Sequence, residues 1–220
     1  MIIERRTANE SAELERKATA SRDITWEEGK VRPDERARLL GQEPVTIWLT
    51  GLSGSGKSTI ARELERRLID AGRACFVLDG DNLRHGLNRD LGFSAEDRRE
   101  NIRRVAEVAR LMNEAGLIVV TAFISPYRED RAAARRIVGP NRFIEAHLAT
   151  DLATCERRDP KGLYAKARRD EIPEFTGVSA PYEAPEAPDV VLDTATDDLE
   201  VCVARLLEFT VPAETGPRSR

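Results

Sequence analysis

Residues 45–59, VTIWLTGLSGSGKST, decide the fold of this chain. A continuous apolar run of strand length leads into a loop of glycines and serines, and a helical pattern follows directly. Gly51, Gly56, Lys57 and Ser58 satisfy the spacing G-x-x-x-x-G-K-[ST], and the order strand, loop, helix is the context that the spacing requires. The stretch therefore predicts a phosphate-binding loop rather than a simple glycine turn.

The loop is suited to the phosphates of ATP. Its glycines allow the backbone N–H groups to turn toward phosphate oxygens, and the following helix presents the positive end of its dipole to the same charge. Lys57 is expected to reach the transferable end of the triphosphate, and the Ser58 hydroxyl is expected to bind Mg²⁺. The loop residues predicted to bind ATP are Gly51, Leu52, Ser53, Gly54, Ser55, Gly56, Lys57, Ser58 and Thr59.

The overall composition narrows the class of protein. The 220 residues contain no run that approaches the roughly 20 apolar residues of a membrane span, and the N-terminus lacks the apolar segment of a signal peptide. We therefore expect a cytoplasmic protein without a membrane partner. The formal net charge of −4 disfavours a nucleic acid as partner. Cys75, Cys155 and Cys202 are widely spaced, which argues against a disulfide framework or a cysteine-rich metal site.

Apolar runs and helical patterns alternate along the chain. The expected strands are 45–50, 74–79, 117–123, 143–148 and 189–194. The expected helices are 57–71, 95–115, 128–138 and 197–209, with a shorter one opening at Pro33. Because continuously apolar strands that alternate with helices are typical of parallel sheets, the sequence predicts an α/β fold. Its sheet is expected to be mostly parallel, five-stranded and covered by helices on both faces.

Composition also suggests where the domain begins and ends. Residues 1–23 are charged and have little apolar patterning, so we expect a frayed or disordered extension. Residues 24–210 are expected to form one domain, and residues 211–220 a disordered tail. The segment at 151–180, before the last strand, is polar, basic and contains prolines. This insertion is expected to cover a site rather than to build the core.

Two carboxylates follow the second predicted strand, in the sequence LDGDNLRHG. Ligands of open parallel sheets collect at the carboxyl ends of the strands, so Asp79 and Asp81 are expected beside the phosphate loop. A carboxylate at this place can accept a proton from an attacking hydroxyl or hold Mg²⁺. The spacing does not divide these roles between the two residues. We favour Asp79 as the base, and we also expect it to act with Ser58 at the metal.

A further polar group follows in the sequence between residues 84 and 101. Arg84 and Arg98 flank Phe93, and Asn101 lies near the start of the long predicted helix. A planar ring between guanidinium groups suits a nucleotide-like acceptor, because the ring can stack on a base and the guanidinium groups can bind anionic oxygens. A solvated basic helix face with Phe93 in the core is the alternative. The residues alone leave both interpretations open.

Five motifs extend the pattern beyond the phosphate loop. In chain order they are TGLSGSGKST, LDGDNLRHGLNRDLGFSAEDRRENIRR, AFISPYREDR, CERRDPKGLYAKAR and FTGVSAPYEAPEAPD. Together they closely resemble the adenylylsulfate kinase family. The resemblance implies a P-loop kinase fold and Mg²⁺-dependent transfer of the γ-phosphate of ATP to the 3′-hydroxyl of adenylyl sulfate. It also implies, commonly, a homodimer, and it leaves open an association with ATP sulfurylase.

The same resemblance implies a set of acceptor-binding residues, which are Asp81, Arg84, Phe93, Arg98, Asn101, Ile124, Ser125, Lys161, Leu163 and Phe175. Phe93 and Phe175 would enclose the adenine of the acceptor. Family descriptions name the serine at the position of Ser125 as a phosphoserine intermediate. Such an intermediate needs its own base and two in-line transfers, whereas direct attack needs one transfer. We therefore favour direct transfer, with Ser125 as a binding residue.

The basic insertion is similar to the lid of other small-molecule kinases. Six Lys and Arg residues lie between positions 157 and 169. A charge run of this kind is usually a solvated face, but in a lid it would bring positive charge to the phosphates and exclude water. The resemblance implies that Arg157 lies near the ATP base or phosphates.

Other functions use only part of this pattern. Another P-loop kinase, for a sugar acid or a nucleotide, would keep the loop and Asp79 but would not need Phe93 and Phe175 with two arginines. A nucleotide-switched or motor-like protein would need switch segments or a ring interface. An inactive scaffold of a sulfate-activating complex would not need the intact loop and both aspartates. The sequence therefore favours a kinase that acts on adenylyl sulfate.

Overall fold

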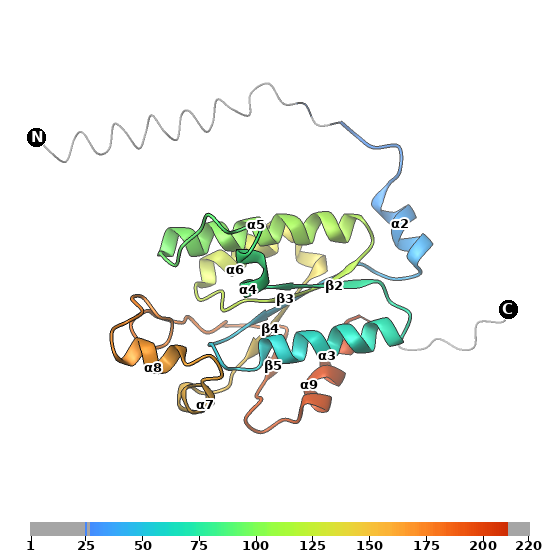
Figure 1. Cartoon of the computed structure of the whole chain (residues 1–220). Helices are drawn as coiled ribbons and strands as arrows, with labels where there is room; N and C mark the ends of the chain where they lie inside the picture. Colours follow the sequence, from blue (N-terminus) through green and yellow to red (C-terminus); the bar gives the residue numbers. More distant parts are fainter. Residues whose placement is uncertain (1–24, 26, 211–220) are drawn as a thin grey trace, which may run out of the picture. The chain divides into compact units, whose positions relative to one another are not determined.

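The computed structural model describes residues 25 and 27–210, so the predicted extension at 1–23 and the predicted tail at 211–220 lie outside the described residues. Contacts divide the chain into two compact units, residues 1–32 and 33–220. The sheet and the helices belong to the second unit (Figure 1). Among the described helices, none is long and apolar enough to cross a bilayer.

The sheet has five strands, and each neighbouring pair is parallel. The strands are β1 (Thr46–Thr50), β2 (Cys75–Asp79), β3 (Ile118–Ala122), β4 (Phe143–Leu148) and β5 (Val190–Leu192). Their order is β2-β3-β1-β4-β5. The predicted five-stranded sheet is confirmed, and it is parallel throughout. The strand that enters the phosphate loop, β1, is central, and all five of its residues are buried.

Helices cover both faces of the sheet, as the alternating pattern predicts. The long helices are α3 (Lys57–Asp70), α5 (Ala95–Glu114), α6 (Arg128–Val138) and α9 (Leu199–Leu207). Helices α3 and α9 lie on one face, and α5 and α6 lie on the other (Figure 1). Successive side chains of β1 point to opposite faces of the sheet. Ile47 and Leu49 pack in the core on the α3 side, and Trp48 packs in the core on the α5 side.

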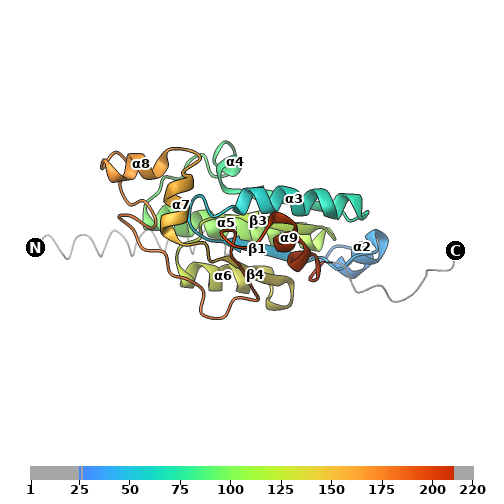
Figure 2. The same ribbon diagram turned by 90° about the horizontal axis from the view of Figure 1, so that it is seen from below.

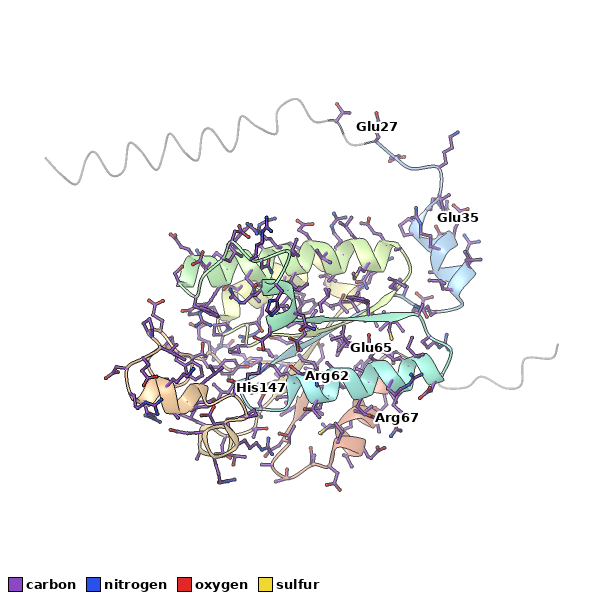
Figure 3. The ribbon with its side chains drawn as sticks, viewed as in Figure 1. Glu27, Glu35, Arg62, Glu65, Arg67 and His147 are labelled. Atoms are coloured by element: carbon purple, nitrogen blue, oxygen red, sulfur yellow. The ribbon has the colours of Figure 1, made fainter. Side chains whose placement is uncertain are left out.

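Polar contacts form along α3 and between α3 and its neighbours α9 and β2. Arg67 donates from Nε to Glu63 at 2.9 Å, and its Nη2 pairs with Glu200 of α9. Glu65 accepts a hydrogen bond from the backbone N–H of Val77 in β2 at 3.2 Å. Arg67 and Glu65 lie along α3 in Figure 3. These contacts hold the helix that begins at Lys57 against the sheet.

The structure contains short helices in addition to the predicted ones. Helix α2 (Pro33–Leu40) opens at Pro33 as expected, while α4 (Gly80–Arg84), α7 (Leu152–Arg158), α8 (Leu163–Arg168) and a 3₁₀ turn at Pro140–Arg142 were not predicted. Arg84 is the last residue of α4. Such elements are too short for a hydrophobic period to identify, and caps define some of them: Asp151 accepts from the N–H of Thr154 at 2.8 Å. Figure 2 shows α7 and α8 beside the start of α3.

Candidate active site

The phosphate loop joins the carboxyl end of β1 to α3. Gly54 and Gly56 have φ values of +75° and +96°, in the left-handed region that favours glycine. A Cβ atom on Gly54 would lie 2.9 Å from the carbonyl oxygen of Cys155, which belongs to α7. Position 54 therefore requires glycine both for its backbone conformation and for the close approach of α7.

Lys57 is held over the loop by backbone carbonyls. Its Nζ donates to the oxygens of Gly51 at 2.8 Å and Leu52 at 2.6 Å. Burial lowers the pKa of the ammonium group to about 8, because the carbonyl dipoles replace only part of the lost hydration. An anionic ligand in the loop would favour the charged form. The position and the charge of Lys57 fit the predicted role at the transferable phosphate.

Ser58 and Asp79 lie together at the start of α3 and the end of β2. Ser58 Oγ donates to Asp79 Oδ2 at 2.7 Å, and Asp79 Oδ1 accepts from the N–H of Asp81 at 3.0 Å as it caps α4. A hydroxyl and a carboxylate are oxygen ligands that suit Mg²⁺. Within residues 25 and 27–210, no group of three His, Cys, Asp or Glu side chains could hold a metal.

Asp81 pairs with a residue of the insertion. Its carboxylate forms an ion pair with Lys161, which lies between α7 and α8. Both side chains are exposed, with 66% of Asp81 and 56% of Lys161 accessible to solvent. The pair is therefore weak by itself, since water screens it. It nevertheless places these two predicted site residues together and links α4 to the insertion.

The insertion packs on the phosphate loop through a small core of its own. Its buried residues are Cys155, Tyr164, Ala167 and Phe175, and Leu52 of the loop packs against them. Tyr164 also donates from its hydroxyl to the carbonyl oxygen of Ser53 at 2.9 Å. Leu163 lies partly buried at the margin of the same core. These contacts place the insertion over the loop, and its opening and closing stays a prediction.

Arg158, which the sequence did not single out, reaches the phosphate loop. It donates to Thr194 Oγ1 at 2.7 Å and to the Thr194 carbonyl at 2.6 Å, and Thr194 Oγ1 donates to the carbonyl of Ser55 at 3.0 Å. The predicted neighbour Arg157 instead donates to Thr154 Oγ1 at 3.1 Å. Spacing cannot distinguish adjacent arginines, because the direction of each depends on where α7 ends. That Arg157 contacts ATP stays a prediction.

The predicted acceptor residues gather around an exposed aromatic ring. Phe93 is 58% exposed, and the guanidinium carbons of Arg84 and Arg98 lie 4.2 and 5.8 Å from its ring centroid. Arg98 also donates to the carbonyls of Phe93 at 2.8 Å and Glu174 at 2.9 Å. Arg98 thus joins the Phe93 loop to the residue that precedes Phe175. The large exposed ring favours a binding role over the core role that the sequence left open.

Phe175 differs from Phe93 in its surroundings. It is only 7% exposed, and its ring packs edge-to-face against Tyr164 with a centroid distance of 5.0 Å. Part of the Phe175 ring is therefore covered by Tyr164 of the insertion. That Phe93 and Phe175 enclose an adenine stays a prediction.

Arg84 and Arg98 bind backbone carbonyls rather than carboxylates in the described part of the chain. Arg84 donates to the carbonyls of Leu91 and Gly92 at 2.9 Å, and neither Arg84 nor Arg98 is paired with a carboxylate among the residues that the structure describes. Burial lowers the pKa of both guanidinium groups, which nonetheless remain protonated. The region around Phe93 is therefore suited to an anionic acceptor.

Ser125 is buried and fully engaged. Its hydroxyl donates to Thr50 Oγ1 at 2.9 Å and accepts from Trp48 Nε1 at 3.2 Å. Its φ of +38° is unusual for serine, and Arg131 donates to its carbonyl at 2.7 Å. Thr50 Oγ1 also donates to the carbonyl of Ile124 at 2.8 Å. The segment at the end of β3 is therefore fixed to β1, and the Ser125 hydroxyl is held in place on both its donor and its acceptor side.

A ring pair lies behind this segment. Tyr182 shares a hydrogen bond of 3.0 Å with Thr50 Oγ1 and stacks on His147 at a centroid distance of 5.9 Å. His147 lies at the end of β4 in Figure 3. Burial and the charge of Arg131 lower the pKa of His147, which favours its neutral form. Neither ring was selected from the sequence, because their partners lie far apart along the chain.

Comparison with known proteins then identifies the family. The family model described as adenylylsulphate kinase matches residues 43–193. The chain belongs to the adenylylsulfate kinase family. Membership of this family confirms the prediction made from the motifs and makes the chain an enzyme, a P-loop kinase that uses a nucleotide substrate.

Similar proteins cover most of the chain. The probable adenylyl-sulfate kinase of Bacillus subtilis (strain 168) is 56% identical over 189 residues, which are 86% of this chain and 96% of that protein. The adenylyl-sulfate kinase of Shewanella pealeana is 55% identical over 85% of this chain and 91% of its own length. The structure of the APS kinase CysC of Mycobacterium tuberculosis with AMPPNP and APS has a TM-score of 0.74 and 48% identity, and the match covers 76% of this chain and 97% of that one.

Proposed function

We propose that this member of the family transfers the γ-phosphate of ATP to the 3′-hydroxyl of adenylyl sulfate, giving ADP and 3′-phosphoadenylyl sulfate. One observation carries the proposal: an exposed Phe93 ring lies between two arginines that form no ion pair with any described residue, in the same domain as the phosphate loop. The ring suits a base, and the arginines suit the phosphate and sulfate groups of the acceptor. The structure of the Mycobacterium tuberculosis relative, solved with AMPPNP and APS, supports this choice of substrates.

The reaction is an in-line displacement at the γ-phosphorus. The 3′-oxygen of the acceptor forms a new bond to phosphorus, and the bond from phosphorus to the β–γ bridging oxygen breaks, so that its electron pair leaves with ADP. Lys57 and the backbone N–H groups of the loop stabilise the negative charge on the transferred group. The hydroxyl proton passes to a nearby carboxylate.

The contacts of the two aspartates suggest how they divide the work. Asp79 Oδ2 accepts from Ser58 beside the phosphate loop, and its Oδ1 accepts from the backbone of α4, so both oxygens of Asp79 are engaged. We assign Ser58 and Asp79 to Mg²⁺, which would neutralise charge on the phosphates when bound. Asp81, at the exposed side of α4, is then the better candidate to accept the proton. This assignment revises the preference for Asp79 as the base.

The remaining site residues act in binding. Phe93 and Phe175 would stack on the acceptor adenine, Asn101 and the two arginines would bind its oxygens, and Ile124 would line the pocket. On the insertion, Lys161 and Leu163 would approach the acceptor, while Arg157 would approach ATP. Closing the insertion over both substrates would exclude water and so limit hydrolysis of ATP.

Direct transfer agrees better with the surroundings of Ser125 than a phosphoserine does. The Ser125 hydroxyl already donates to Thr50 and accepts from Trp48, and its side chain is 3% exposed. A phosphoryl group there would remove the hydrogen bond that Ser125 donates to Thr50, and it would bury a double negative charge, which is costly without cationic partners. Ser125 is therefore proposed to shape the acceptor pocket through its backbone and its fixed position.

Three expectations about the setting of the enzyme stay predictions. They are the homodimer, the association with ATP sulfurylase and the cytoplasmic location. Each came from the resemblance or from the composition of the sequence.

One assay tests the proposed reaction. ADP formation is followed with ATP and Mg²⁺ in the presence of adenylyl sulfate, gluconate or a nucleoside monophosphate. We expect acceptor-dependent ADP formation with adenylyl sulfate, at a kcat/KM at least about 100-fold above the other acceptors, because those lack partners for the ring or for both arginines. Equal or better turnover with gluconate or a nucleoside monophosphate would refute the proposal.

A further inference from the structure

We infer that Asn88 is a positioning residue for the acceptor: it orients the side-chain amide of Asn101 so that Asn101 Nδ2 is presented as a donor to an oxygen of the acceptor. The inference rests on the proposed function, because it concerns the same acceptor pocket. Asn88 lies within one of the motifs quoted above, but it is not among the predicted site residues and was given no role in the site described above.

Asn88 is fixed in a defined place beside Asn101. It is fully buried in the loop between α4 and α5, and its Nδ2 donates to Asn101 Oδ1 at 2.9 Å. Its backbone N–H donates to the carbonyl of Leu83 at 2.9 Å. Arg104 of α5 donates to the carbonyl of Leu87 at 3.1 Å and so ties the same loop to the helix. The contact between the two amides is therefore held by backbone as well as side-chain bonds.

This contact leaves the other half of the Asn101 amide available. Asn101 Oδ1 is used by Asn88, whereas Asn101 Nδ2 makes no hydrogen bond among the described residues. Although Asn101 is only 5% exposed, its Nδ2 is not among the fully buried atoms that lack partners, so this donor reaches accessible space. Asn101 lies one turn after Arg98 on α5, on the same side of the helix. A donor is thus placed next to the guanidinium group that contacts Phe93.

The opposite amide orientation fits the loop less well. If the oxygen and nitrogen of both side chains were exchanged, the bond between them would persist, but Asn101 would present an acceptor. Asn88 would then leave a buried N–H without a partner. In the observed orientation Asn88 Oδ1 is the buried atom without a partner, and unpaired carbonyl oxygens are the commoner of the two in proteins. The observed polarity suits an acceptor molecule that carries anionic oxygens.

Asn113 shows what a purely structural asparagine looks like on the same helix. It is also fully buried, but both of its polar groups are satisfied: Oδ1 accepts from Thr46 Oγ1 at 2.8 Å, and Nδ2 donates to the carbonyl of Leu117 at 3.0 Å. Asn88 instead leaves one atom unpaired and directs its one side-chain bond to a predicted site residue. Buried unpaired atoms call for an explanation, and orientation of Asn101 supplies one.

The test is a mutant cycle on the full chain with steady-state kinetics. We expect Asn88→Ala and Asn101→Ala each to raise the KM for adenylyl sulfate about tenfold, about 1.4 kcal/mol, while the KM for ATP stays within about twofold. The double variant should resemble the single variants, because each change removes the same interaction. Asn113→Ala is the matched control, and its thermal stability should fall while the KM for adenylyl sulfate does not change.

Asn88→Asp provides a second readout that depends on pH. A carboxylate cannot donate to Asn101 Oδ1, but a protonated carboxyl group can. The KM of Asn88→Asp for adenylyl sulfate, relative to wild type, should therefore fall toward one as the pH is lowered. If Asn88→Ala does not fold, this comparison decides the question.

Two results would overturn the inference while the wild-type enzyme phosphorylates adenylyl sulfate normally. One is an unchanged acceptor KM in Asn88→Ala. The other is a double variant whose KM rises by the product of the single effects, since that would make the two residues independent. Failure of the proposed function would look different, because the wild-type chain itself would not use adenylyl sulfate.

Discussion

Binding of ATP should weaken as Lys57 loses its proton. The pKa of Lys57 is about 8 in the protein without nucleotide, because the side chain is buried among the carbonyls of the loop. The phosphates of ATP favour the charged form, so the pKa rises well above this value in the complex. The bound state then holds a proton that the free state releases above pH 8, and affinity falls as the pH rises.

The pKa sets the size of the effect. At pH 7 about nine-tenths of the free protein carries a protonated Lys57, and at pH 9 about one-tenth does, given a pKa of about 8. The dissociation constant of a nucleotide should therefore be about tenfold larger at pH 9 than at pH 7, which is about 1.4 kcal/mol. Below pH 7 this group should cause almost no further change.

Titration of Lys57 cannot weaken nucleotide binding at high pH by unfolding the protein. The pKa in the folded protein, about 8, lies below the ordinary value of 10.5, so the unfolded chain binds more protons between these pH values. The contribution of Lys57 to the free energy of unfolding therefore becomes more favourable as the pH rises across this window. Affinity and stability should move in opposite directions.

Isothermal titration calorimetry with AMPPNP and Mg²⁺ at pH 7, 8 and 9 measures the effect. Lys57→Arg is the control, because a guanidinium group stays charged over this range, and its affinity should be independent of pH whatever its absolute value. A wild-type dissociation constant that changes by less than about twofold between pH 7 and pH 9 would refute the argument. If the dissociation constant of Lys57→Arg changed with pH as much as that of the wild type, a group other than Lys57 would cause the effect.

Three further changes test separate parts of the site. Phe93→Ala should raise the KM for adenylyl sulfate about 10- to 100-fold with little change in the KM for ATP, because base stacking contributes about 1–3 kcal/mol. Steady-state kinetics would show no difference between the two KM values if the ring does not bind the base. Ser125→Ala should lower the free energy of unfolding by about 1 kcal/mol yet retain turnover. A phosphoserine mechanism instead requires that this variant lose all activity and that mass spectrometry detect a phosphorylated wild-type protein. Tyr164→Phe removes the bond to the Ser53 carbonyl and should lower stability by about 1 kcal/mol in denaturant unfolding, with unchanged stability indicating that the insertion does not stay on the loop.

Much of the fold could be predicted because the central strand and the long helices each have a recognisable local pattern of apolar residues. The run before Gly51 is central and buried, and the helix after it begins at Lys57 as predicted. The strand at Phe143–Leu148 has the predicted ends, although Glu145 and His147 interrupt its apolar residues and three of its six residues are only partly buried. The short helices were missed because caps such as Asp79 define them and no full hydrophobic period develops.

The site was predictable where a motif fixes geometry, and less so where packing does. Ser58 and Asp79 meet because strand ends and the loop share one edge of the sheet. Arg158 was not predicted because only the direction of its side chain at the end of α7 distinguishes it from Arg157. Asn88 lies in a motif, but nothing in the spacing shows that its side chain turns inward to Asn101.

The most direct test of the central claim follows the transferred phosphate itself. The chain is incubated with Mg²⁺, ATP labelled in the γ-phosphate, and either adenylyl sulfate or its 3′-deoxy analogue, and the products are separated and assigned by ³¹P NMR. We predict that the label appears on the 3′-oxygen of adenylyl sulfate and that the 3′-deoxy analogue receives none. Label on any other atom, or equal labelling of the 3′-deoxy analogue, would contradict the account.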